Sequence, residues 1–154
     1  MQQYDGSLPP RLAELLQTFE SLAEEADRSE ILIDYAAKFE GVPERVAKRP
    51  YAVDHRVAFC ESEAYVWAIE QPAQTLKFYF AVENPSGISA KALAVILDKT
   101  LSGAKPEQIA NVSPDIVYEI FRRDISMGKG MGLTSMVYTV QQLARRYIAR
   151  ILNN

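Results

Sequence analysis

A continuous apolar stripe near the end of the chain constrains the fold most strongly. Its members recur every three or four residues: Leu133, Met136, Val137, Val140, Leu143, Ala144, Tyr147, Ile148 and Ile151. This spacing places them on one face of an α-helix. The sequence therefore predicts a long final helix that packs on the rest of the fold.

Shorter helical patterns precede this stripe. Ser7 provides a capping hydroxyl, and Pro9 and Pro10 suit a first helical turn, which predicts a helix that begins there. A second helix is predicted from about Ser29 until Gly41. Three further helices are predicted over residues 90–101, from Pro106 and over 113–121.

Two central segments have the composition of strands. Residues 65–70 and 76–83 are rich in aromatic and β-branched side chains, and residues 71–74 suit the turn between them. A shorter strand is predicted at 56–59. The expected fold class is α+β, with a small antiparallel sheet of about three strands flanked by helices in a single domain over residues 1–154.

Glycines surround Lys129 just before the final helix. Gly128, Gly130 and Gly132 resemble a phosphate-binding loop, but they lack the Walker spacing and do not follow a strand. We interpret residues 127–132 as a flexible break.

Composition and charge argue against a membrane protein, a secreted protein and a nucleic-acid-binding protein. The chain has 154 residues, of which 48% are hydrophobic and 24% charged, as in ordinary soluble globular proteins. It has no apolar run long enough to span a membrane, and residues 1–7 lack the pattern of a signal peptide, so a cytoplasmic location is expected. The net charge of −3, without a clustered basic patch, argues against a nucleic-acid partner.

The chain has one cysteine, Cys60, and one histidine, His55. An intramolecular disulfide is therefore impossible. Zinc sites and iron–sulfur clusters normally need several thiolate or imidazole ligands, so no metal site of that kind is expected. A cluster scaffold is disfavoured for the same reason.

The thiol of Cys60 is the most reactive nucleophile that the sequence offers. His55 and Arg56 would favour its thiolate, whereas Glu61 and Glu63 would oppose it. A Cys–His nucleophilic pair is conceivable, but nothing else in the sequence suggests a hydrolase. On composition alone, a buried structural cysteine is the more common case.

Four stretches, in order along nearly the whole chain, carry a resemblance to a known family. They are Leu32 to Tyr35 with Lys38, Phe39 and Pro43; Val57, Cys60 and Ser62; Lys91 to Leu93 with Gly103 and Pro106 to Ile109; and Gly132, Leu133, Met136, Val137 and Leu143. In these stretches the chain resembles the SufE-type sulfur acceptors, which activate cysteine desulfurases.

Several positions depart from the family pattern. Phe59 replaces the glycine before the cysteine, and Lys129 replaces an arginine, which keeps the charge but loses the planar fork. Ala64-Tyr65 stands where Val-Trp is usual, and residues 83–86 replace an acidic loop that lies near the cysteine in the family. These departures bear on loop geometry and on the choice of partner.

The resemblance implies a SufE/IscU-like α+β fold and a role for Cys60. Cys60 would accept persulfide sulfur from a cysteine desulfurase, stimulate that enzyme and deliver sulfur to scaffold proteins that assemble iron–sulfur clusters. Ser62, Glu61 and Lys129 would contact the partner or support the loop. The chain would be no enzyme and hold no cofactor, since pyridoxal phosphate belongs to the desulfurase.

An alternative function stays open. The chain could be a module that binds and regulates the desulfurase while Cys60 is only structural. Neither interpretation includes a membrane or a nucleic acid as partner.

Overall fold

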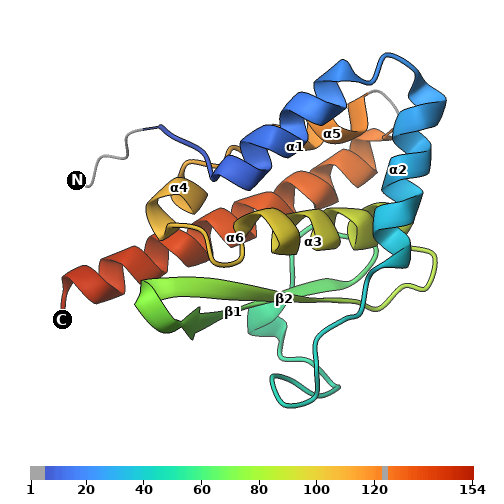
Figure 1. Ribbon diagram of the computed structural model, residues 1–154. Helices are drawn as coiled ribbons and strands as arrows, with labels where there is room; N and C mark the ends of the chain where they lie inside the picture. The colour runs from blue at the N-terminus through green and yellow to red at the C-terminus, as the bar shows by residue number, and fades with distance from the viewer. Residues whose placement is uncertain (1–5, 123–124) are drawn as a thin grey trace.

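The structure is a computed structural model that describes residues 6–122 and 125–154 (Figure 1). The N-terminal residues 1–5, which are part of the segment considered for a signal peptide, lie outside the described residues. The helices are α1 (Pro10–Ser21), α2 (Glu25–Ala37), α3 (Ile88–Leu101), α4 (Pro106–Ala110), α5 (Ile116–Phe121) and α6 (Met127–Leu152). The strands are β1 (Ala64–Gln71) and β2 (Thr75–Val82), and short 3₁₀ turns occur at η1 (Val53–His55) and η2 (Pro72–Gln74).

The sheet is a single antiparallel pair in the described residues. Its register runs from Ala64 opposite Val82 to Gln71 opposite Thr75. The prediction of about three strands was wrong by one, because the segment at 56–59 forms only a single bridge between Arg56 and Tyr65. Pairing stops there because the chain turns at Phe59, whose φ is +59°. The predicted α+β class is confirmed.

Helices cover one face of the sheet, and the segment before β1 crosses the other face (Figure 1). On that outer face, Tyr51 lies edge-on to Trp67, with ring centroids 5.1 Å apart. His55 stacks on the same indole at 5.2 Å, and its Nδ1 hydrogen-bonds the carbonyl of Val66 at 3.1 Å. These contacts hold the segment that leads to Cys60 against the sheet.

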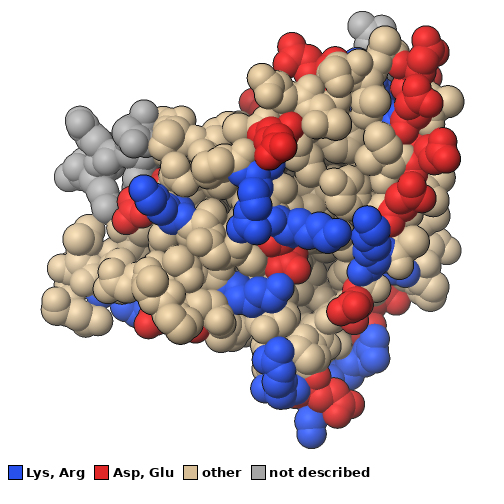
Figure 2. Space-filling model, viewed as in Figure 1, with Lys and Arg blue, Asp and Glu red and all other residues tan. Residues whose placement is uncertain are grey.

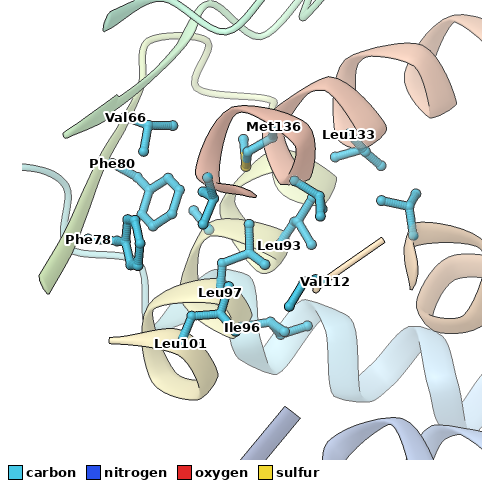
Figure 3. Close-up of a cluster of buried hydrophobic side chains, with 14 of the residues drawn as sticks. Val66, Phe78, Phe80, Leu93, Ile96, Leu97, Leu101, Val112, Leu133 and Met136 are labelled. Atoms are coloured by element: carbon cyan, nitrogen blue, oxygen red, sulfur yellow. The ribbon is translucent and has the colours of Figure 1, made fainter. Parts of the chain in front are cut away.

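The core lies between the inner face of the sheet and helices α3 and α6. Figure 3 shows Phe78 and Phe80 of the sheet beside Leu93 and Leu97 of α3, with Met136 of α6 above them. Leu93 and Met136 are fully buried. The predicted stripe of the final helix is the face that α6 presents to this core.

Helix α6 begins earlier than predicted. The glycine-rich residues 127–132, interpreted above as a flexible break, form its first turns, so that interpretation was wrong. Ser126 caps the helix, with its Oγ accepting from the backbone N–H of Lys129 at 3.2 Å. Gly130 N–H continues the helical pattern by donating to the Ser126 carbonyl at 2.9 Å.

Two other helix starts differ from the prediction. Pro9 occupies the N-cap position of helix α1 without a side-chain capping hydrogen bond. The predicted capping residue, Ser7, lies outside the helix start, and its carbonyl accepts from Asn111 Nδ2 at 2.7 Å. Helix α2 begins at Glu25, four residues before Ser29. Glu25 and Asp27 lie in its first turn, where carboxylates interact favourably with the helix dipole.

Candidate functional site

Cys60 lies in a tight double turn between the bridge at Arg56 and strand β1. Val57 N–H donates to the Ala64 carbonyl at 2.8 Å, and Glu63 N–H donates to the Cys60 carbonyl at 3.1 Å. Phe59 and Glu63 both have positive φ, at 59° and 51°. We call residues 57–63 the cysteine loop.

The cysteine loop is held by the chain that leaves β2. Asn84 N–H donates to the Ser62 carbonyl at 3.1 Å, and Glu83 N–H donates to the Glu63 carbonyl at 3.2 Å. The side chain of Glu83 is held as well, because both of its carboxylate oxygens accept from Arg49 Nε, at 2.9 and 3.0 Å. This hydrogen bond raises the pKa of Arg49. The altered segment 83–86 therefore lies directly against the cysteine loop, as the family resemblance implied.

Helix α6 approaches the cysteine loop at a glycine. A Cβ atom at Gly132 would lie 3.0 Å from Cys60 Cα and 3.0 Å from the Phe59 carbonyl oxygen. Both neighbours are backbone atoms, so no side-chain rotation could relieve the contact. Only glycine allows the helix and the loop to come this close.

A second glycine has a similar role at the start of α3. A Cβ atom at Gly87 would lie 2.8 Å from Ser62 Oγ and 3.0 Å from Val82 Cγ1. Ser62 is thus packed between the cysteine loop and the N-terminus of α3. The two glycines explain how the cysteine loop fits between two helices.

Cys60 is buried, with 8% of its surface exposed. It forms part of the wall of a pocket of about 210 Å³ between the cysteine loop, segment 84–90 and the first turns of α6. The pocket is lined by Cys60, Glu61, Ser62, Asn84, Ser86, Gly87, Ile88, Ser89, Ala90, Gly128, Lys129, Gly132 and Leu133. Both polar and apolar groups therefore surround the thiol.

The structure brings the four predicted site residues together. Cys60, Glu61, Ser62 and Lys129 all line this pocket. Glu61 reaches the start of α6, since its Oε1 is 3.8 Å from the position of a Cβ atom at Gly128. An acidic and a basic side chain thus face the space beside the thiol.

His55 has a different position from the one a Cys–His pair requires. Its ring is stacked on Trp67 and hydrogen-bonded to strand β1. The ring is held by the sheet, and it is absent from the lining of the pocket at Cys60. The arrangement gives no support to a Cys–His nucleophile.

Phe59 is a feature of the site that the sequence did not assign to it. Its side chain is 72% exposed, next to a buried cysteine. Its left-handed backbone costs a non-glycine residue about 1–2 kcal/mol. The signal in the sequence was the replacement of the family's glycine, a departure that bears on loop geometry. The positive φ of Phe59 is a conformation that glycine adopts readily.

The described residues offer no cluster of three His, Cys, Asp or Glu side chains that could hold a metal ion. Within the same residues, no helix is both long and apolar enough to cross a bilayer.

A second concave surface lies between α2, α3 and β2, away from Cys60. Figure 2 shows basic side chains gathered in the middle of this face and acidic ones along α2. Lys38, Arg45, Lys77 and Lys99 line a cleft of about 660 Å³, together with Asp98. Lys77 Nζ pairs with Asp98 Oδ1 at 2.6 Å. This cleft contains both signs of charge.

The comparison with protein families decides the classification. The model of the SufE family, described as an Fe–S metabolism associated domain, matches residues 13–144. The chain belongs to the SufE family. Its association with Fe–S metabolism therefore rests on a match over most of the chain, in agreement with the motifs around Cys60.

Two individual relatives extend this finding. SufE-like protein 1, chloroplastic/mitochondrial, from Arabidopsis thaliana is 25% identical over 138 residues, which cover 89% of this chain and 35% of the relative. The chain thus spans about a third of the length of this curated SufE-like relative. A solution structure of a hypothetical protein from Thermus thermophilus shares the fold, with a TM-score of 0.73 and 27% identity over 92% of this chain and 98% of that one.

Proposed function

We propose that this member of the SufE family is a sulfur carrier. Cys60 accepts persulfide sulfur from a cysteine desulfurase, the acceptance stimulates the desulfurase, and the sulfur is delivered for iron–sulfur cluster assembly. The observation that carries the proposal is the position of Cys60. The only thiol of the chain lies in a loop bordered by a pocket and packed against two helices at their glycines.

The transfer step is a thiol–persulfide exchange. The Cys60 thiol gives its proton to solvent, and the thiolate attacks the terminal sulfur of the desulfurase persulfide. A bond forms between Cys60 Sγ and that sulfur, and the sulfur–sulfur bond of the donor breaks. The donor cysteine leaves with the electron pair as a thiolate, which later takes up a proton. No external oxidant or reductant is needed.

A movement of the cysteine loop precedes this step. In the described conformation Cys60 is 8% exposed, too little for a protein-bound persulfide to reach it. The loop carries positive φ at Phe59 and Glu63, on either side of the cysteine. Rotation at these two residues moves Cys60 outward. The buried conformation protects the thiol from oxidation while no donor is bound.

The residues around the pocket have supporting roles in this proposal. Lys129 places a basic side chain in the lining of the pocket that contains Cys60. Glu61 and Lys129 contact the partner when the loop moves out, and Ser62 supports the loop through its packing on Gly87.

The proposal also specifies the cofactor requirement and the partner proteins of the chain. Pyridoxal phosphate stays on the desulfurase, and the chain needs no cofactor of its own. Its partners are the desulfurase and the scaffold proteins that receive the sulfur, in the cytoplasm, with no nucleic acid involved.

The second candidate is a regulatory module that binds the desulfurase while Cys60 is structural. The burial of Cys60 and its inclusion in the hydrophobic core favour this candidate. The chemistry favours the carrier, because a structural cysteine would not need a polar pocket beside it.

The variant Cys60→Ser separates the two candidates. Serine keeps the shape of the side chain but cannot form a persulfide. We expect wild type to accelerate cysteine turnover by a purified desulfurase, measured as alanine formation, and Cys60→Ser to leave it at the rate of the desulfurase alone. Full stimulation by Cys60→Ser would establish the regulatory module instead.

A further inference from the structure

The surface around the cysteine loop exposes several large apolar side chains. Phe59 is 72% exposed and Val53 is 75% exposed, and together with Arg56, Cys60 and Glu61 they line a shallow groove of about 530 Å³. Ile88 is also half exposed and lines the pocket described above, which shares Cys60 and Glu61 with this groove. Apolar side chains that gather in this way mark a surface that binds another molecule.

Phe59 is the least expected member of this surface. Its side chain is open to water, and its backbone has the left-handed conformation that glycine adopts most easily. Both properties disfavour phenylalanine in the isolated protein. Most of the side-chain surface is left uncovered in the isolated protein, and it is available for contact with another molecule.

The position of Phe59 next to Cys60 indicates that the sulfur donor is the molecule that contacts it. It directly precedes Cys60, and a donor sulfur must come within bonding distance of Cys60 Sγ. A donor that is itself a protein must then cover residue 59 and the groove it shares with Val53. Exposed aromatic rings at the centre of such contacts contribute most of the affinity when they enter a pocket of the partner.

We propose that Phe59 is the aromatic contact through which this chain recognises the protein that presents the persulfide. The proposal rests on the sulfur-carrier function and adds a specificity-determining residue to it. The partner has an apolar pocket beside its persulfide cysteine, and its rim is polar where it meets Arg56 and Glu61.

The test uses three substitutions at one position in the full chain. Phe59→Gly removes the ring and suits the positive φ, and Phe59→Asn removes the ring while it tolerates the same backbone. Phe59→Tyr keeps the ring. Leu152→Ala removes an exposed apolar side chain at the far end of α6, about 30 Å along the helix from Gly132.

The measurement is the dissociation constant for a purified cysteine desulfurase, by calorimetry, with every variant in a Cys60→Ser background. This background keeps the docking test independent of sulfur transfer. We expect Phe59→Gly and Phe59→Asn to weaken binding about tenfold or more, as for a central aromatic contact. Phe59→Tyr and Leu152→Ala should bind as the parent does. The urea midpoint of Phe59→Gly should rise, which excludes unfolding as the reason for weaker binding.

Three results would overturn the inference. Equal affinity of Phe59→Gly and the parent would show that the ring makes no contact with the donor. Self-association of the parent in sedimentation, abolished by Phe59→Gly, would make the surface an interface between two copies. If the Cys60→Ser parent did not bind the desulfurase at all, the proposed docking surface would be wrong as well. If binding depended on Phe59 but Cys60 received no sulfur, only the carrier function would be contradicted.

Discussion

Replacing Gly132 with valine is expected to displace the cysteine loop and to expose the Cys60 thiol. The new Cβ would lie 3.0 Å from two backbone atoms of the loop, and the γ carbons add further volume. Forcing extra methyl groups into a packed contact costs about 1–3 kcal/mol. We expect a lower urea midpoint, and faster reaction of the native protein with a chromogenic thiol reagent, because the loop gives way before the long helix does.

Gly128→Val is the matched control for this prediction. Gly128 lies one turn earlier in the same helix, and its nearest neighbour for a Cβ atom is a flexible carboxylate oxygen of Glu61 at 3.8 Å. The same substitution there should leave thiol reactivity near that of wild type. Equal thiol reactivity in wild type and Gly132→Val would contradict the close approach of α6 to Cys60.

Replacing Leu93 with alanine is expected to have the largest effect on stability. Leu93 is fully buried on α3 between the sheet and α6 (Figure 3). Truncating such a leucine removes apolar contacts and leaves a cavity, at a cost of about 2–5 kcal/mol. Urea unfolding followed by circular dichroism should show this loss as a lower midpoint with an unchanged slope.

The same substitution at an exposed leucine provides the comparison. Leu152 is 66% exposed at the end of α6, and Leu152→Ala should change the free energy of unfolding by less than about 0.5 kcal/mol. Equal effects of the two substitutions would mean that Leu93 is not part of a packed core.

The parts of the fold that depend on local pattern could be predicted. The segments rich in aromatic and β-branched side chains at 65–70 and 76–83 correspond to β1 and β2, and the apolar stripe from Leu133 corresponds to the buried face of α6. The resemblance in four stretches along nearly the whole chain led to the family, because the motif residues occur in the right order. The strand and helix signals each lie within one stretch of sequence.

The errors arose where contacts between distant segments decide the structure. Three glycines disfavour a helix by propensity, yet Gly132 is needed for the contact with the cysteine loop, and tertiary packing outweighs propensity there. The segment at 56–59 has the composition of a strand, but the turn at Phe59 limits it to one bridge.

The candidate site shows the same limit. Cys60, Glu61 and Ser62 are neighbours in sequence, whereas Lys129 joins them only because α6 folds back onto the loop. The local charges around Cys60 could not decide whether it is buried, because its closest covering comes from Gly132 on a helix distant in sequence. The single-domain organisation and the roles of these residues stay predictions.

The central claim is that Cys60 carries sulfur, and the mass of the protein tests it most directly. The chain is incubated with a purified cysteine desulfurase and cysteine, separated without reductant, and weighed intact and as the peptide that contains Cys60. The account predicts wild-type protein heavier by one sulfur atom, with the added mass on the Cys60 peptide and removed by reductant, and no added mass on Cys60→Ser. Unmodified Cys60 in a wild-type protein that still accelerates the desulfurase would contradict it.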